Sequence, residues 1–214
     1  MSGLGAAMLA LVLALNFGIS WWNARACGRA WEESRAIGGW IRVVVWCGAI
    51  QSAIGFSSVF MLPLVFLAHA AFPDTFTSET LNGALNLWYV TIIFPALGSG
   101  LALTIESWIA AYRERSLMTI GIAAYNTLAQ VHNTLGAIDS FGPAFRSVGD
   151  MFSSVVTTKD DAKGKAGLLG AMLAVAVVAI ALFAGTILTA VLIRRYAGTV
   201  PLPAAPGAMR PQAA

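Results

Sequence analysis

Charged side chains are scarce in this sequence, and their scarcity excludes an ordinary soluble fold. Asp, Glu, Lys and Arg make up 11% of the 214 residues, whereas a soluble domain carries about 25%. Hydrophobic residues make up 58%. A globular domain of this length cannot bury so much apolar surface from water. We therefore expect a lipid bilayer to surround much of the chain.

Side chains for metal, redox and nucleophilic chemistry are also few. The chain has two cysteines, Cys27 and Cys47, and two histidines, His69 and His132, none of them at a metal-binding spacing. A bis-histidine haem needs both rings at one depth, but the topology predicted below places them on opposite sides. The HExxH, GxSxG and glycine-rich nucleotide motifs are missing. We therefore expect no cofactor, no metal and no enzymatic activity.

The net charge gives no indication of a nucleic-acid partner. The formal charge of +3 comes from short basic clusters beside apolar segments. Such clusters orient membrane proteins, because cytoplasmic loops collect Lys and Arg. We therefore expect no nucleic acid among the partners.

Four long apolar runs account for most of the composition. A bilayer core about 30 Å thick is crossed by about 20 helical residues, and each run is long enough to cross once. Glu106 is the single charged residue within them. We therefore predict an all-α integral membrane protein, a four-helix transmembrane bundle, with runs at Leu4–Trp22, Val43–Phe72, Leu87–Ile109 and Gly167–Ile193.

These runs divide the chain into segments. We predict transmembrane helices over 1–24, 40–72, 83–112 and 166–195. The connecting segments are a cytoplasmic loop at 25–39, an external loop at 73–82, a cytoplasmic amphipathic segment at 113–165 and a Pro- and Ala-rich, disordered tail at 196–214.

The orientation follows from the basic residues. With both termini outside, ten Lys and Arg residues are cytoplasmic and three are external. A five-span topology, in which 117–138 also crosses, leaves nine inside and four outside, so charge does not decide between the two. The stretch carries Asn126, Gln130, His132 and Asn133, which are costly to bury without partners, and this favours four spans. Alanine-rich spans and short loops favour a bacterial inner membrane.

The long cytoplasmic segment has helical periodicity. Apolar residues recur every three or four positions from Met118 to Ile138, and again from Phe145 to Val155. Ser140–Pro143 is expected to separate two amphipathic helices. These helices either pack on each other or on the membrane surface, or bind a cytoplasmic protein partner through 117–156 or form the neck of a homo-oligomer.

Polar side chains within spans are functional candidates, because hydrocarbon leaves them unpaired. The candidates are Asn16, Gln51 and Glu106. An amide here either bonds a neighbouring helix or lines a pathway. Glu106 either reaches the interface, where Arg113 or another arginine pairs with it, or faces a water-filled cavity.

Small residues at four-residue spacing are candidate helix-packing positions, because they allow close approach of two backbones. They serve either contacts within one chain or a homo-oligomer. They are Ala96 and Gly100 in the third span, and Gly170, Ala174, Ala181 and Gly185 in the fourth.

The function predicted from these features is a non-enzymatic membrane subunit that oligomerises or anchors a cytoplasmic partner. The alternative is a small channel, pore or holin-like protein with Gln51 and Glu106 facing the lumen.

Overall fold

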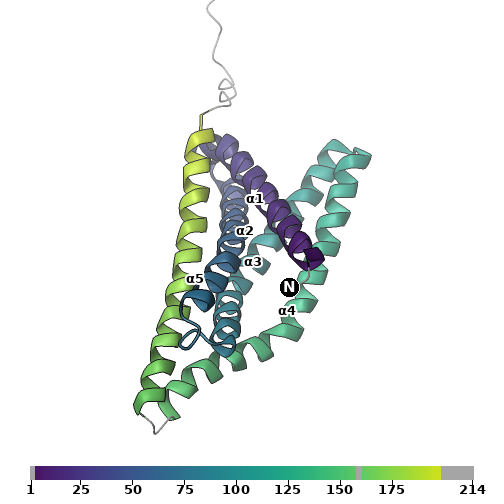
Figure 1. The fold of residues 1–214 in the computed structure, drawn as a ribbon. Coiled ribbons are helices and arrows are strands. Elements are labelled where there is room, and N and C mark those ends of the chain that lie inside the picture. The colour runs from purple at the N-terminus through teal and green to yellow at the C-terminus, as the bar shows by residue number, and fades with distance from the viewer. Residues whose placement is uncertain (1–2, 158–160, 199–214) are drawn as a thin grey trace, which may run out of the picture.

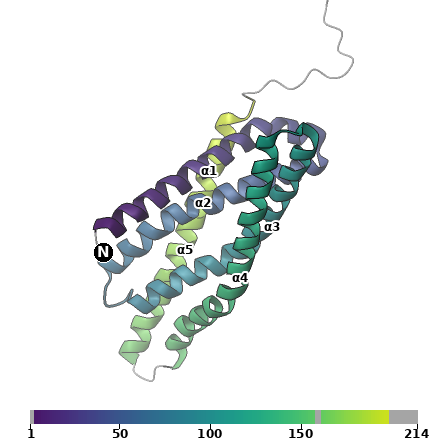
Figure 2. The same cartoon turned by 90° about the vertical axis from the view of Figure 1, so that its right-hand side faces the viewer.

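Five α-helices make up the chain over residues 3–157 and 161–198, the ranges that the computed structural model describes. Consecutive helices run in opposite directions along the molecule, and α5 returns beside α2 and α1, meeting α4 near the C-terminal end of α4 (Figures 1 and 2). The helices are α1 (Gly3–Ile37), α2 (Gly39–Ala71), α3 (Ser78–Glu114), α4 (Leu117–Thr157) and α5 (Asp161–Tyr196).

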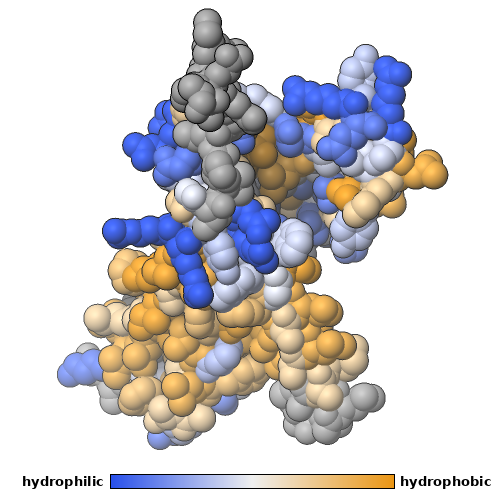
Figure 3. Space-filling model, turned by 90° about the horizontal axis from the view of Figure 1, so that it is seen from above, coloured by the Kyte–Doolittle hydropathy of each residue, from blue (hydrophilic) through white to orange (hydrophobic). Residues whose placement is uncertain are grey.

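Four of the helices are long and apolar enough to cross a bilayer, which confirms the predicted number of apolar spans and indicates a membrane protein. These stretches are Ala7–Ile37, Gly39–Ala71, Ser78–Glu114 and Lys165–Tyr196. Figure 3 views the molecule from above: hydrophobic residues spread over one half of the surface, and hydrophilic residues gather in the other half.

The connections between the first helices are shorter than predicted. α1 continues to Ile37, so most of the predicted loop at 25–39 is helical, and the reversal occurs at Gly38 and Gly39, with φ of 69° and 60°. Glycine adopts this left-handed conformation without a steric penalty. α3 begins at a Thr77 cap, whose hydroxyl accepts a hydrogen bond from the Thr80 N–H at 3.3 Å.

α4 is one continuous helix, which differs from the predicted break at Ser140–Pro143. Pro143 removes one backbone hydrogen bond, but contacts with α3 hold the helix on both sides of it. The Phe94 and Phe141 ring centroids are 5.5 Å apart, and Asn86 Nδ2 donates to Ser147 Oγ at 3.0 Å. The connection from α4 to α5, residues 158–160, lies outside the described residues.

The end of α4 and the start of α5 lie at the same end of the bundle as the connection between α2 and α3, because α4 runs in the opposite direction to α3. Gly170 lies so close to this connection that an added Cβ would be 2.5 Å from the Thr75 carbonyl oxygen. The other end of α5 lies beside α1, where the Arg25 guanidinium carbon is 5.5 Å from the centre of the Tyr196 ring. We call these the α2–α3 end and the α1–α2 end of the bundle.

This arrangement differs from the predicted orientation of the C-terminal helix. The sequence-based topology put Arg194 on the opposite side from Arg25, because it gave the segment 113–165 no crossing. In the structure α4 runs antiparallel to α3, so α5 finishes at the α1–α2 end.

Apolar packing is concentrated at two levels of the bundle. The larger cluster, at the α2–α3 end, joins all helices except α1 and includes Met61, Val65, Phe76, Met151, Ala174 and Ala181. The smaller one, toward the α1–α2 end, consists of Ala24, Phe56 and Leu192.

α5 approaches α2 closely at Gly185. An added Cβ there would lie 2.5 Å from the Ala53 carbonyl oxygen and 2.6 Å from the Ser57 nitrogen. These are backbone atoms, so they cannot move aside as a flexible side chain would.

We predict that Gly185→Ala lowers stability by about 1–3 kcal/mol, the usual cost of overpacking a core. Gly98→Ala is the matched control, because a Cβ added at this helical glycine meets nothing within 4 Å. Thermal unfolding of purified protein in detergent, followed by tryptophan fluorescence, measures both variants. If Gly185→Ala unfolded at the same temperature as Gly98→Ala, the close contact of α5 with α2 would be wrong.

Candidate functional site

Polar side chains connect α1, α2 and α5 inside the bundle. Asn16 Nδ2 donates to Ser58 Oγ at 2.5 Å, and Ser52 Oγ donates to the Ser20 carbonyl at 2.7 Å. Thr189 Oγ1 donates in turn to Ser52 Oγ at 3.4 Å. The structure thus places Asn16 in an interhelical hydrogen bond.

Gln51 binds the turn of α3 that follows Pro95. Its Nε2 donates to the Ala96 carbonyl at 2.7 Å and to Ser99 Oγ at 3.0 Å. From the other side, Gln130 Nε2 of α4 donates to the Leu97 carbonyl at 3.1 Å. Two amides from different helices therefore hold one turn of α3.

Gly100 makes this double contact sterically feasible. A Cβ added at Gly100 would collide with the Gln130 amide oxygen and would lie 3.4 Å from Gln51 Nε2. Ala96 and Gly100, predicted as helix-packing positions, thus lie at the point where both glutamine side chains reach α3.

Glu106 is held at a different place from Gln51. Trp40 Nε1, in the first turn of α2, donates to Glu106 Oε2 at 2.5 Å; Trp40 is exposed and Glu106 is half-buried. Glu106 follows Ser99, the partner of Gln51, by seven residues, or about 10 Å along a helix. Gln51, on α2, therefore contacts α3 about two turns away from Glu106.

Three adjoining cavities line α3 and α4. The first, about 300 Å³, is bounded by Gln51, Tyr89, His132, Asn133 and Ser140 among others. The second, about 500 Å³, shares Tyr89 and Ser140 with the first and adds Asn86 and Asp139. The third, about 790 Å³, shares Pro143 with the second and extends to Arg146, Asp150, Asp74 and Glu79 at the α2–α3 end.

We call this row of cavities the polar cleft. On the α4 side of the cleft, His132, Asp139 and Arg146 recur every seven residues and therefore lie on one side of the helix. All three side chains are exposed. The cleft therefore presents ionisable groups along several turns of α4.

The polar cleft extends from the α2–α3 end to the middle of the candidate spans. Ser147, next to Arg146, bonds Asn86, and two residues further along α3 Trp88 Nε1 donates to Ser57 Oγ at 3.1 Å. Ser57 is near the midpoint of α2 (Gly39–Ala71). Arg146 shares a cavity with Asp74 and Glu79 and so lies toward the α2–α3 end from this level. Asp139 is two helical turns deeper, two residues from Phe141, which contacts Phe94 near the midpoint of α3 (Ser78–Glu114).

Sequence reasoning found part of this site and missed the rest. It singled out Gln51, which lines the cleft, but not Asp139, Arg146, Asn86 or Tyr89. The seven-residue spacing of His132, Asp139 and Arg146 was a usable signal. It was overlooked because 113–165 was assigned to the cytoplasm, where charged side chains need no explanation.

The predicted small residues of α5 face other parts of the same chain. Gly170 contacts the α2–α3 connection and Gly185 contacts α2, while Ala174 and Ala181 are fully buried in the larger apolar cluster. These contacts are intramolecular.

A second face of α4 is apolar and points away from the bundle. Its exposed side chains recur every three or four residues, and Leu128 and Ile138 each keep about 70% of their surface exposed (71% and 69%). The α3-facing residues Ala123 and Ala137 are buried in contrast. We call the exposed set the outer α4 face, made up of Leu128, Val131, Leu135, Ile138, Phe145 and Phe152.

Comparisons of the chain with protein families, curated proteins and solved structures find no match. In the part of the chain that the structure describes, no group of three or more His, Cys, Asp or Glu residues is arranged to hold a metal ion. The polar cleft and the outer α4 face are therefore the features from which we infer a function.

Proposed function

We propose that this protein is a non-enzymatic integral membrane subunit that oligomerises through the outer α4 face. The observation that carries the proposal is the exposure of Asp139 near the depth of the span centres, with Arg146 two turns closer to the α2–α3 end. Ionisable side chains at this depth are costly against hydrocarbon, and they face protein or water instead.

A neighbouring copy of the chain meets this requirement. The outer α4 face repeats with 3–4 spacing, the pattern by which helices pack side by side. The glycines 142 and 149 fall in the same repeat and allow close approach. A copy docked there would cover the edge of the polar cleft. Alternatively, residues 117–156 bind a different, cytoplasmic protein and anchor it to the membrane.

The proposal includes a crossing by α4. Its first part, 117–138, contains no charged residue, and several of its polar groups are bonded to α3. Besides the Gln130 bond, Trp108 Nε1 donates to Thr127 Oγ1 at 2.9 Å. Of the four polar residues that argue against a crossing, Gln130 is bonded to α3, and His132 and Asn133 line the polar cleft. With the α1–α2 end cytoplasmic, as its arginines favour, the N-terminus is external and the C-terminus cytoplasmic, in place of the expectation that both are external.

We predict that reporters fused to the two termini of the full chain report opposite sides of the membrane. A reporter after Ala214 should match one inserted between Gly38 and Gly39, because α5 finishes beside the end of α1. Paired alkaline phosphatase and fluorescent-protein fusions in a bacterial host measure both positions. An external signal after Ala214, together with an external N-terminus, would restore the four-span topology.

We predict that Leu135→Cys forms disulfide-linked dimers in membranes, because Leu135 lies in the middle of the outer α4 face. Cys27 and Cys47 are replaced by alanine in the background. Ala137→Cys is the matched control, since Ala137 is 6% exposed and faces α3. Non-reducing gels after mild oxidation measure the dimer fraction. Equal dimer fractions at positions 135 and 137, or none at either, would contradict association through this face.

Permeation is the second candidate function, and the continuity of the polar cleft favours it. The cavities share Tyr89, Ser140 and Pro143, so they form one row from the α2–α3 end to Gln51. Glu106, bonded to Trp40, lies outside this row. If the protein conducts ions, we expect Asp139, and not Glu106, to be the acidic residue that faces the lumen.

The permeation hypothesis predicts potassium efflux from liposomes that contain the purified protein. Asp139→Asn should reduce the rate, because it removes a carboxylate from the polar cleft, whereas Glu33→Gln on α1 should not. Efflux is measured with an ion electrode against protein-free liposomes. Absence of efflux, with dimers still formed at position 135, would leave the non-conducting subunit as the function.

A further inference from the structure

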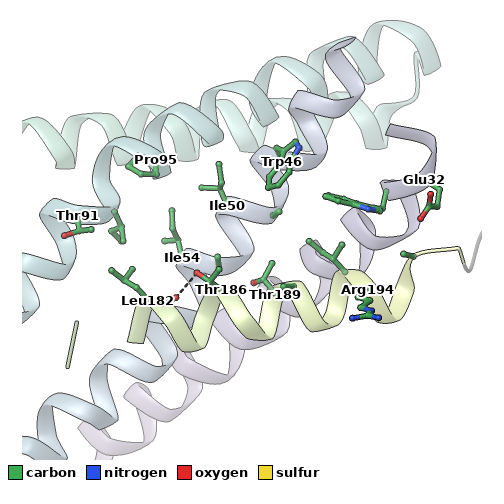
Figure 4. Close-up of a pocket in the computed structure, with 17 residues that line it drawn as sticks. Glu32, Trp46, Ile50, Ile54, Thr91, Pro95, Leu182, Thr186, Thr189 and Arg194 are labelled. Carbon is green, nitrogen blue, oxygen red and sulfur yellow. Dashed lines mark hydrogen bonds between the residues drawn. The ribbon is translucent and has the colours of Figure 1, made fainter. Parts of the chain in front are cut away.

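A separate cavity of about 680 Å³ lies along α5 between α2 and α3 (Figure 4). We call it the apolar groove. Its walls are mostly aliphatic and aromatic, with Trp46, Ile50, Ile54, Pro95, Leu182 and Ile193 among the lining residues. The volume is in the range of small-ligand sites.

The hydroxyl groups in the wall of the apolar groove already have partners within the protein. Thr91 Oγ1 donates to the Leu87 carbonyl and Thr186 Oγ1 to the Leu182 carbonyl, both at 2.8 Å. Thr189 Oγ1 donates to Ser52. The wall therefore offers few donors to a polar solute, and hydrocarbon is the better chemical match.

The length of the groove fits one leaflet of a bilayer. From Leu182 to Arg194 it follows twelve residues of α5, or about 18 Å of helix. One leaflet of the hydrocarbon core is about 15 Å thick. Trp31 and Trp46 line the end near Arg194, with ring centroids 5.5 Å apart. Tryptophan prefers the interface between hydrocarbon and water, so this end corresponds to the headgroup level.

The same end of the groove carries two opposite charges. Glu32 from α1 and Arg194 from α5 both line it (Figure 4), and no ion pair between them is formed in the described structure. A phosphate is a strong partner for an arginine, and an ammonium group is the complementary partner for a carboxylate. A headgroup that carries both charges matches this end.

We propose that the apolar groove binds one acyl chain of an amino-phospholipid, with its phosphate at Arg194 and its ammonium group at Glu32. The site rests on the membrane location of the chain and is independent of association through α4. An anionic lipid without an amine satisfies Arg194 but not Glu32, so the site prefers phosphatidylethanolamine to phosphatidylglycerol.

The charge pair is tested with lipid mixtures. Full-length protein is reconstituted in nanodiscs of equal parts phosphatidylethanolamine and phosphatidylglycerol, extracted in mild detergent, and its retained lipids are quantified by mass spectrometry. Glu32→Gln should reduce the ratio of retained phosphatidylethanolamine to phosphatidylglycerol about tenfold, the loss of one charge-assisted contact, whereas Glu33→Gln should leave it unchanged. Arg194→Gln should lower retention of both lipids, with Arg195→Gln as its control.

The acyl-chain position is tested by filling the groove. Thr186→Trp places a large ring in the groove and should lower retention of both lipids, whereas Ile187→Trp, at the adjacent exposed position, should not. Unchanged lipid ratios in Glu32→Gln, or equal retention in the two tryptophan variants, would overturn the proposal. Loss of dimers without loss of lipid in Thr186→Trp would assign the groove to a second copy and overturn it as well.

Discussion

Hydrogen bonds between the polar side of α4 and the length of α3 set the arrangement of the remaining structure. Gln130, Thr127 and Ser147 all bond to α3, on both sides of Pro143. Because these contacts keep α4 antiparallel to α3, α5 begins at the α2–α3 end and finishes beside α1. The same contacts direct the aliphatic side chains of α4 outward. Gln130, one of the four polar residues that argue against a membrane position for 117–138, is thus part of the contact that packs this segment on α3.

Some helix pairs of the bundle pack closely, whereas others leave cavities between them. The candidate sites lie in these cavities. α5 packs closely on α2 through Gly185, and on the α2–α3 connection through Gly170. Beyond the larger apolar cluster, the apolar groove separates α3 from α5, and the polar cleft borders α3 on the side of α4. The two cavities favour different contents. The charged side chains of the cleft favour contact with water or protein, and the aliphatic walls of the groove favour contact with hydrocarbon.

Gln51 illustrates how a single intramembrane amide serves both packing and the site. Its two hydrogen bonds fix α2 to α3 at Ala96 and Ser99, and the same side chain lines the inner end of the polar cleft. Interhelical bonds of this type contribute about 0.6 kcal/mol on average. The positioning of α3, more than the strength of the bond, is therefore what Gln51 contributes.

The sequence by itself determined the helical class and the four apolar spans, because an uncharged run of about 20 residues has no stable alternative to a helix in lipid. It also singled out Gln51, as one of few polar groups within a span. Only the tertiary structure decided the continuity of α4, the end of the bundle at which α5 finishes, and the gathering of Asp139, Arg146, Asn86 and Tyr89 in one cleft. These features depend on contacts between different helices, from Trp108 with Thr127, 19 positions apart, to Asn86 with Ser147, 61 positions apart. Local periodicity carries no information about which helix a given face meets.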